Sequence, residues 1–539
     1  MSEVEVEVEV EVGREVEFTG GEALVAALAE LGVEVAFGLP GVHNLAAWKA
    51  FGTSELRLVG VRHEQTAGYA ADGYARATGR LGVALTTTGP GAANVVAATG
   101  EAWSCHTPLL VIATDIPTTS RRAGEYRGVL HETTDQASFF RPVTKAVVQV
   151  TRAQDLHGDL VRAGRLAMTP PRRPVYVEIP TDLLSAAVSA PEPVLDFAPA
   201  VLVTPVLDSV VAALMSASRP LLWLGGGATS ADAGAAAQAL AVRLGAPVLC
   251  SYGGRGLLPP DHPNMVPLPP HSEPAGRLWD AADVVLVVGS DLDAMNTQGW
   301  RQPAPTTLIS LDLVRPVNYP PDVFVQIDAR QGLEQVVALL PENAREPWFT
   351  RPAARPPMPF LDALEPALPA DAVVVADMCV AGYWFGGFGK VGRPRGLAYP
   401  VGWGTLGFGF PAALGAALSG RPTVAVVGDG GFLFACGDLA TAAQEQLPVT
   451  VVLVDDGGYG MLRYDFTVHG EQPVGTELEP PDFVALARAF RVDAVEVTEA
   501  GLGAALAAGI ASGRPNLVVL KATYDPPPNT SPNWYRAAT

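Results

Sequence analysis

The sequence predicts an α/β protein made of three consecutive doubly wound, parallel-sheet domains. Apolar runs of strand length alternate with helical stretches along the 539 residues, and this alternation is typical of parallel sheets with crossover helices. Two segments rich in proline, 190–205 and 342–359, interrupt the alternation and indicate linkers. The expected division is an acidic disordered tail at 1–17, domains at 18–187, 206–340 and 360–524, and a C-terminal tail at 525–539.

The strands expected within each domain are short and apolar, as buried parallel strands are. In the first domain we expect a helix at Glu22–Leu31 and strands at Val35–Phe37, Leu56–Val61, Val83–Thr87, Leu109–Ala113 and Val175–Ile179. In the second domain we expect strands at Leu221–Leu224, Pro247–Cys250, Val284–Val288 and Leu308–Leu311. In the third we expect them at Val373–Val375, Thr423–Val427, Val449–Val454 and Leu517–Leu520.

The composition argues against several classes of protein. The formal charge is −20 with no basic cluster, which disfavours nucleic acid as a partner. No stretch of 18 uninterrupted apolar residues exists, so no membrane span is expected. The N-terminus has no secretory signal pattern, and the four cysteines fit neither a zinc site nor a disulfide framework. Buried free thiols in a reducing cytoplasm are therefore expected.

The first residues form an acidic repeat, in which residues 3–12 repeat Glu-Val five times. The alternation has the period of a strand, but seven glutamates among the first 17 residues repel one another. We therefore expect a disordered tail. The alternative is that this segment adds to the edge of a partner's sheet.

A glycine-rich turn followed by two carboxylates is the strongest functional signal. The turn Gly428-Asp429-Gly430-Gly431 follows a predicted strand and opens a helical stretch. It can offer backbone N–H groups and the positive end of a helix dipole to a phosphate. Asp456 follows the next strand, so both carboxylates should reach the same edge of the sheet. Two carboxylates beside a phosphate site favour a Mg²⁺-bound diphosphate, whereas an ordinary turn with surface carboxylates is the alternative.

This pattern resembles the diphosphate motif of thiamine-diphosphate enzymes, with the second metal ligand 27 residues after the first Asp. The resemblance implies that Mg²⁺ takes Asp429, Asp456 and the backbone carbonyl of Gly458. It implies cofactor contacts from Gly428, Gly430, Gly431 and Tyr459. The family usually has Asn where Asp456 stands, so this chain places an extra negative charge beside the diphosphate. The three-domain order is similar to that of the decarboxylase and acetolactate synthase branch, with pyrimidine-binding, central and diphosphate-binding domains.

A second segment resembles the catalytic-glutamate region of that family. Val61-Arg62-His63-Glu64-Gln65 leads into Ala70–Arg76, where a helix is expected to start. By itself Glu64 would be a first-turn residue favoured by the helix dipole. The resemblance implies a carboxyl group that contacts N1′ of the aminopyrimidine and promotes loss of the C2 proton of the thiazolium ring.

Two glycine-containing loops are expected to line the same cofactor. The segment 402–411 resembles the one that bends thiamine diphosphate into its V shape. The resemblance makes Leu406 the wedge between the two rings and the Gly404 carbonyl an acceptor for the 4′-amino group. The segment Thr88–Asn94 resembles a loop that lines the pocket across the subunit interface, so Gly89 and Asn94 are candidate cofactor contacts. The alternatives are a loop with helix-breaking glycines and a tight turn.

Two histidines are candidates for the reacting end of the site. His43 resembles a family residue near the reacting carbon, as proton donor or substrate contact, with a solvated loop histidine as the alternative. His131 stands where acetolactate synthases carry Gln. His106 precedes a buried strand and is expected to be structural. The chain lacks both the adjacent His pair of the decarboxylase branch and the His that benzoylformate decarboxylases place at Thr86–Thr88. These absences favour a carboligase-like site.

The central domain gives a weaker signal. Gly289–Asp293 only partly resembles the segment that accompanies FAD in acetolactate synthases, which usually has a basic residue where Asp291 stands. A negative charge there would repel a pyrophosphate, so FAD is not expected. Gly225–Gly227 is expected to be a turn at the end of a strand rather than a nucleotide site.

The sequence thus predicts an enzyme that uses thiamine diphosphate and Mg²⁺ to decarboxylate a small 2-oxo acid and transfer the acyl unit to an acceptor, as an acetolactate-synthase-like carboligase does. Pro40–His43 and Leu130–Glu132 also resemble decarboxylases for guanidino 2-oxo acids, so a simple decarboxylase is the alternative. A non-catalytic cofactor-binding paralogue is another, but it should lack Glu64. Because Glu64 and the metal ligands lie in different domains, the resemblance implies sites shared between the subunits of a homodimer or homotetramer.

Overall fold

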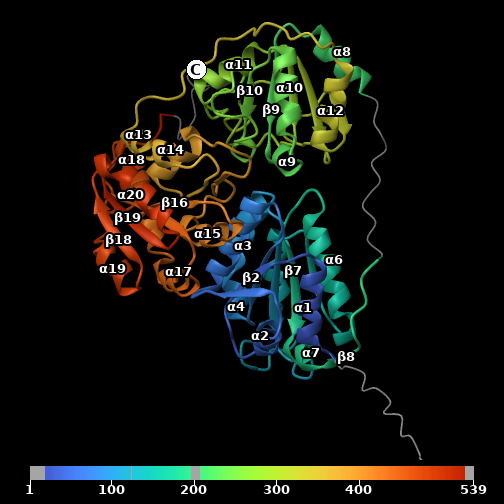
Figure 1. Cartoon of the computed structure of the whole chain (residues 1–539). Coiled ribbons are helices and arrows are strands. Elements are labelled where there is room, and N and C mark those ends of the chain that lie inside the picture. The colour runs from blue at the N-terminus through green and yellow to red at the C-terminus, as the bar shows by residue number, and fades with distance from the viewer. Residues whose placement is uncertain (1–17, 123, 196–206, 529–539) are drawn as a thin grey trace, which may run out of the picture.

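The computed structural model describes residues 18–122, 124–195 and 207–528. Figure 1 shows three α/β blocks that follow one another along the chain. The expected acidic tail at 1–17 lies outside the described residues, as do most of the C-terminal tail and part of the 190–205 linker. The predicted fold class is confirmed, because each block is built on a parallel sheet of its own.

The first sheet has six parallel strands. In spatial order they are β3 (Arg57–Gly60), β2 (Val35–Gly38), β4 (Gly82–Thr86), β5 (Leu109–Asp115), β7 (Val175–Pro180) and β6 (Ala146–Gln149). The helices of this block are α1 (Gly20–Glu30), α2 (Leu45–Gly52), α3 (Glu64–Thr78), α4 (Pro90–Asn94), α5 (Val96–Ser104), α6 (Leu156–Met168) and α7 (Thr181–Ser185). A short antiparallel ribbon pairs β1 (Phe18–Thr19) with β8 (Ala187–Val188).

The second sheet has five parallel strands. In spatial order they are β10 (Val248–Cys250), β9 (Pro220–Leu224), β11 (Val284–Val288), β12 (Thr307–Asp312) and β13 (Val323–Gln326). Its helices are α8 (Asp208–Ser216), α9 (Gly226–Ser230), α10 (Gly234–Leu244), α11 (Glu273–Ala281) and α12 (Ala329–Leu339).

The third sheet again has six parallel strands. In spatial order they are β15 (Leu397–Ala398), β14 (Val373–Ala376), β16 (Thr423–Gly428), β17 (Val449–Asp455), β19 (Asn516–Lys521) and β18 (Asp493–Val497). Its helices are α13 (Pro359–Leu364), α14 (Val380–Phe388), α15 (Gly409–Ala416), α16 (Asp429–Phe432), α17 (Leu439–Glu445), α18 (Gly460–Val468), α19 (Phe483–Ala489) and α20 (Glu499–Ser512).

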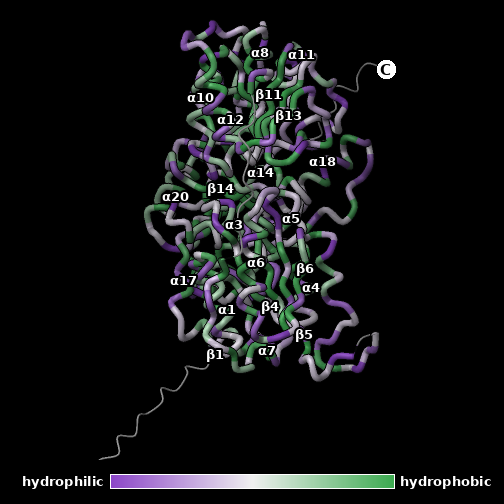
Figure 2. The backbone as a smooth tube through the Cα atoms, turned by 90° about the vertical axis from the view of Figure 1, so that its right-hand side faces the viewer, coloured by the Kyte–Doolittle hydropathy of each residue, from purple (hydrophilic) through white to green (hydrophobic). Residues whose placement is uncertain are grey.

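Each of the three sheets contributes side chains to two hydrophobic cores, one on each face, and the third sheet shares one core with each of the other two. Successive residues of a strand face opposite sides, and Trp223 and Leu224 of β9 accordingly enter different cores. Phe37 of the first sheet and Val427 of the third share one core, while Val426 shares the next core with Trp223 of the second sheet. Figure 2 shows hydrophobic segments concentrated in the interior and hydrophilic ones in the outer loops. The third sheet therefore lies between the other two.

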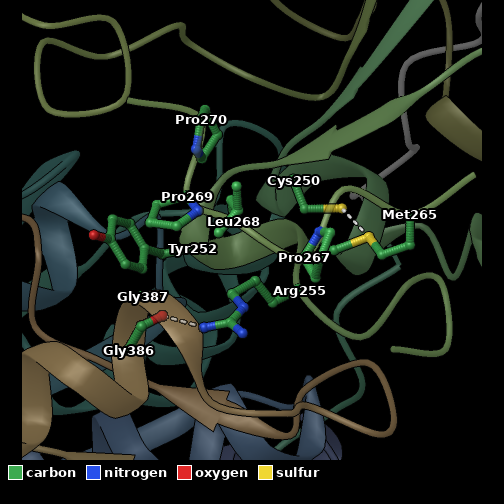
Figure 3. Close-up of a pocket in the computed structure, with 10 residues that line it drawn as sticks. All are labelled: Cys250, Tyr252, Arg255, Met265, Pro267, Leu268, Pro269, Pro270, Gly386 and Gly387. Atoms are coloured by element: carbon green, nitrogen blue, oxygen red, sulfur yellow. Dashed lines mark hydrogen bonds between the residues drawn. The ribbon is translucent and has the colours of Figure 1, made fainter. Parts of the chain in front are cut away.

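A small pocket lies where the central block meets helix α14 of the third block (Figure 3). Arg255 enters it from the central block and points at the C-terminal end of α14. Its guanidinium donates to the carbonyl oxygens of Phe385, Gly386 and Gly389, and it is thus a side-chain cap for this helix. Burial lowers the pKa of Arg255 to about 10.

Sequence reasoning missed the two-residue strands β1 and β8 and the longer strands β6, β13, β15 and β18. Each lies at the edge of its sheet, where one side is unpaired and a continuous apolar run is not required. Asp493–Val497 illustrates this, because none of its five residues is buried. The central strands were all located correctly to within about two residues. The domain boundaries at 187, 206, 340 and 360 remain predictions.

Two other expectations concern the chain as a whole. All four cysteines are free, and Cys250 is buried, whereas Cys105, Cys379 and Cys436 are only partly buried. Among the described residues, each helix is too short or too polar to span a bilayer.

Candidate functional site

The segments that follow four strands of the first sheet carry the three predicted catalytic residues and one predicted cofactor contact, Asn94. His43 follows β2, Glu64 follows β3, Asn94 follows β4 and His131 follows β5. Because the carboxyl ends of parallel strands meet at one edge of a sheet, these four side chains belong to the same edge.

Glu64 is the first residue of α3 and is only 7% exposed. Its Oε2 accepts a hydrogen bond from Asn94 Nδ2 at 3.0 Å. The helix was expected to start near Ala70 but begins at Glu64, because the His63 side chain caps it by accepting from the Gln65 N–H. Glu64 does stand in the first turn. Asn94 ends the five-residue helix α4.

Thr87 packs between Glu64 and the loop that carries His43. A Cβ added to Gly91 would meet the Thr87 side chain at 2.7 Å and Glu64 Oε1 at 3.4 Å. A Cβ added to Gly41, two residues before His43, would also meet Thr87 at 2.7 Å. Both glycines therefore allow a close approach of these loops.

His43 and His131 form a pair that sequence reasoning missed. Their ring centroids are 5.1 Å apart with an edge-to-face angle of 69°. The Nδ1 atoms of both are buried and have no hydrogen-bond partner among the described residues. Burial lowers the pKa of His43, and the charge of His131 lowers it further. The backbone around His131 also packs on Gly89, where an added Cβ would meet the His131 carbonyl oxygen at 2.5 Å.

The third sheet bears an open cleft, with a cavity volume of about 190 Å³, at the carboxyl ends of β14, β16 and β17. The predicted residues that line it are Gly404, Leu406, Gly428, Asp429, Gly430, Gly431, Asp456, Gly458 and Tyr459. The remaining lining comes from the segment Met378–Tyr383, from the start of α18 and from Val454, Ala522 and Tyr524.

Two carboxylates in the cleft have oxygen atoms available for a cation. Asp429 Oδ2 and Asp456 Oδ1 are buried and accept no well-aligned hydrogen bond among the described residues, although Arg463 Nη2 lies 2.9 Å from Asp456 Oδ1 as an ion pair. Burial and the negative charge of Asp456 raise the pKa of Asp429 to about 6. Burial also raises the pKa of Asp456, against the charge of Arg463. A bound cation would relieve both charges, so the donor set fits Mg²⁺.

The surroundings of the glycines in the two turns leave no room for a side chain at these positions. A Cβ on Gly430 would meet the Tyr459 ring at 2.7 Å, and one on Gly431 would meet Asp377 Oδ2 at 2.9 Å. Gly458 has a φ of 153°, and an added Cβ would lie 2.1 Å from the Thr476 carbonyl oxygen. The turns thus keep backbone groups accessible at the mouth of the cleft, as a diphosphate site requires.

Asp377 is a buried residue of this cleft wall that sequence reasoning did not single out. It follows β14 directly, and its Oδ1 accepts from the Met378 N–H at 2.7 Å, while its Oδ2 is buried and has no hydrogen-bond partner among the described residues. Burial raises the pKa of Asp377 to about 6. The side chain also packs on the loop that carries Leu406, because a Cβ added to Gly409 would meet the Asp377 Cβ at 2.9 Å. Its position after a strand, like that of Asp429, was the available signal.

The first and third blocks pack tightly against each other in the same chain. Thr66 donates to Asp438 Oδ2 at 2.6 Å, and the Arg62 N–H donates to Asp438 Oδ1 at 2.8 Å. Helix α3 approaches α15 so closely that a Cβ on Gly73 or Gly415 would overlap backbone atoms. The residues that line the cleft nevertheless all come from 378–524, and Glu64 is not among them.

Comparison with known protein families matches a separate domain to each of the three blocks. Residues 18–139 match the thiamine pyrophosphate enzyme N-terminal TPP binding domain, residues 207–336 the central domain, and residues 377–520 the C-terminal TPP binding domain. The chain belongs to the thiamine pyrophosphate enzyme family. The two cofactor-binding domains of this family are thus the blocks that carry Glu64 and the Asp429–Asp456 cleft.

Relatives of this thiamine pyrophosphate enzyme are decarboxylases and acetolactate synthases. A probable 2-ketoarginine decarboxylase of Pseudomonas aeruginosa is 38% identical over 504 residues, 88% of each chain. The acetolactate synthase isozyme 3 large subunit of Escherichia coli is 30% identical over 513 residues, again 88% of each chain. The structure of a thiamine diphosphate-dependent 4-hydroxybenzoylformate decarboxylase from Rhodococcus jostii has a TM-score of 0.81 at 24% identity, covering 94% of this chain and 100% of that one. This last likeness supports the fold.

The central domain of this family member uses its glycine turns for packing. A Cβ on Gly225 would lie 2.1 Å from the Gly289 carbonyl oxygen, and one on Gly227 would lie 2.7 Å from Gly289 Cα. Asp291 pairs with His106 of the first block at 2.8 Å. The acidic residue that the sequence places here therefore joins two blocks, and His106 has the structural contact expected of it.

Proposed function

We propose that this enzyme decarboxylates a small 2-oxo acid with thiamine diphosphate and Mg²⁺. The observation that carries the proposal is the contact between His43 and His131 on the sheet edge that also holds Glu64. The absence of two adjacent histidines in the sequence had favoured a carboligase. Two distant loops supply an equivalent pair in space, so that reason no longer holds.

The residues of the first block would handle protons. Glu64, oriented by Asn94, would hold the aminopyrimidine and exchange a proton with it. Decarboxylation replaces CO₂ by a proton on the substrate carbon, and the histidine pair can deliver that proton. The lowered pKa of His43 makes its imidazolium form a stronger acid, which would favour transfer of a proton to the substrate carbon. Bound thiamine diphosphate supplies the electron sink for the departing CO₂.

The residues of the third block would hold the cofactor. Mg²⁺ would take Asp429, Asp456 and the Gly458 carbonyl oxygen, and two carboxylates with one carbonyl suit a hard cation. Leu406 and Gly404 would orient the rings from the opposite wall of the cleft. The diphosphate would meet the backbone of Gly428, Gly430 and Gly431, with Tyr459 nearby, and the loop of Gly89 would line the pocket across the subunit interface.

For the substrate we propose a 2-oxo acid whose side chain ends in a guanidino group. The relative at 38% identity is named as a probable 2-ketoarginine decarboxylase. The segments Pro40–His43 and Leu130–Glu132, which resemble decarboxylases of this type, contain the two paired histidines. An assay of CO₂ release from pyruvate, aromatic 2-oxo acids and 5-guanidino-2-oxopentanoate tests the proposal, with the guanidino acid expected to give the highest kcat/KM.

Acyl transfer to a second keto compound is the other candidate. Several relatives near 30% identity are named acetolactate synthases. Running the assay with and without an aldehyde or keto acceptor separates the two. A carboligase would consume the acceptor in proportion to CO₂, whereas a decarboxylase would release an aldehyde. We further propose a homodimer or homotetramer in the cytoplasm.

A further inference from the structure

The second metal position of this chain has a cationic neighbour. Arg463, in the first turn of α18, reaches back over the loop so that its Nη2 lies 2.9 Å from Asp456 Oδ1. The same nitrogen donates to the Asp456 carbonyl oxygen at 2.8 Å. The pair is mostly shielded from water, with side-chain exposures of 19% for Arg463 and 13% for Asp456.

The guanidinium of Arg463 places its positive charge beside the Asp456 carboxylate but gives its hydrogen bond to the Asp456 backbone. Nη2 directs its hydrogen bond to the backbone oxygen, and Asp456 Oδ1 accepts no well-aligned hydrogen bond of its own. The carboxylate is therefore compensated electrostatically while its oxygen remains open to a cation. An arginine bound to both oxygens in fork geometry would instead compete with the metal.

The orientation of Arg463 is supported from a second side. Nη1 lies 3.1 Å from Glu477 Oε2. The strand-like segment that carries Glu477 is itself fastened to the metal loop, because Tyr459 N donates to Thr476 O at 2.8 Å and Leu478 N donates to Gly457 O at 2.9 Å. The guanidinium thus sits in a fixed place between the metal loop and this segment.

We propose that Arg463 is the counter-charge that allows an aspartate to act at the second metal position. This inference rests on the proposed binding of Mg²⁺ and thiamine diphosphate in the cleft. The Asp456–Arg463 pair carries no net charge, as the usual asparagine does. Glu477, the second carboxylate beside Arg463, is 71% exposed and screened by solvent, so the diphosphate meets less repulsion than an unpaired Asp456 would cause. Arg463 acts through Asp456 and is a positioning residue.

A double-mutant cycle tests this role. Calorimetry would measure the affinity for thiamine diphosphate at saturating Mg²⁺ in wild type, Arg463→Gln, Asp456→Asn and the double variant. Arg463→Gln should weaken binding on the order of tenfold or more, the scale of a close charge interaction. The same substitution made in the Asp456→Asn background should change it by about threefold or less. Arg152→Gln, which removes an exposed arginine of the first block, is the charge-matched control and should have no effect.

The possible outcomes separate the inference from the proposed function. Equal losses in both backgrounds would overturn the role of Arg463, whereas absence of binding by wild type would overturn the cofactor site itself. Melting curves of the cofactor-free proteins show whether each variant is folded. Arg463→Lys keeps the charge without the fork and should stay within about threefold of wild type. A folded Arg463→Lys variant that loses as much affinity as Arg463→Gln would also contradict charge compensation.

Discussion

Three buried or partly buried carboxyl groups of the site each contact a different type of polar group. Glu64 is positioned by an amide, Asp377 by a backbone N–H group and Asp456 by a guanidinium. Sequence reasoning located Glu64 and Asp456 from their motifs, but their partners lie 30 and 7 residues away. Motif spacing locates a functional group, whereas the environment that determines its charge comes from the tertiary contacts.

The first prediction concerns Glu64. Glu64→Gln should slow H/D exchange at C2 of bound thiamine diphosphate on the order of a hundredfold or more, the usual contribution of a placed acid–base group. Affinity for the cofactor, measured by calorimetry, should change little, because the amide still fills the site. Glu55→Gln, at an exposed position, is the matched control. Exchange at the wild-type rate in Glu64→Gln would remove this residue from the mechanism.

The second prediction concerns Asp377 and pH. Since its pKa is raised to about 6 in the folded protein and is about 3.9 in an unfolded chain, the folded state binds this proton more tightly. The resulting stability is present in acid and is lost as pH rises through about 6. Cofactor-free Asp377→Asn should therefore gain on the order of 1–3 kcal/mol relative to wild type between pH 5 and pH 8.

The control for Asp377 is an exposed aspartate. Asp208→Asn makes the same charge change at an exposed position and should keep a constant difference from wild type across this range. Asp429 titrates in a similar range but is present in both Asp377→Asn and wild type, so its contribution cancels. Parallel stability curves for Asp377→Asn and wild type would contradict the raised pKa.

At the scale of elements, the sequence predicted the central strands of each sheet and missed several strands at the sheet edges. The central strands are continuous apolar runs because helices cover both faces of each sheet, and they were located accurately. The edge strands β6, β13, β15 and β18 were missed because an edge needs less apolar surface. The start of α3 was misplaced because its cap is a histidine, which is uncommon among capping residues.

The same scale explains why the histidine pair was invisible in the sequence. His43 and His131 stand on loops after β2 and β5, which are separated in the first sheet by β4. Strand order determines which loops become neighbours, and residue spacing does not reveal it. Their side chains also meet only because glycines at positions 41, 89 and 91 let the loops approach closely.

The third prediction concerns the cap of α14. Arg255→Met removes the donor to three carbonyl oxygens at the end of this helix, which should lower the free energy of unfolding on the order of 3 kcal/mol in urea denaturation. Because Val380 and Ala381 at the other end of α14 line the cleft, cofactor affinity should fall as well. Arg152→Met removes an exposed arginine and should change neither quantity by a comparable amount. Unchanged stability of Arg255→Met would show that the cap is dispensable.

At the scale of the whole molecule, the two halves of the predicted site are held in one chain but do not share one cleft. The cleft lining comes entirely from residues 378–524. Large apolar side chains stand exposed in the third block, with Trp403 at 50%, Phe434 at 55% and Leu462 at 51% exposure. Trp403 and Leu462 belong to the loop and helix that line the cleft. Exposed groups of this kind are typical of an interface, and a second copy of the chain would bring its own Glu64 edge to it.

The final prediction follows from this arrangement. If Glu64 of one subunit serves the Asp429–Asp456 cleft of the other, each site of a two-fold dimer takes one half from each chain. Glu64→Gln and Asp429→Ala chains should each be inactive alone. Mixed and allowed to exchange subunits, they should form heterodimers with one intact site, and random pairing should restore about a quarter of wild-type CO₂ release. Native mass spectrometry of the mixture would confirm that heterodimers form. Heterodimers without activity would mean that each chain builds its own site, and an active monomer in light scattering would exclude a shared site altogether.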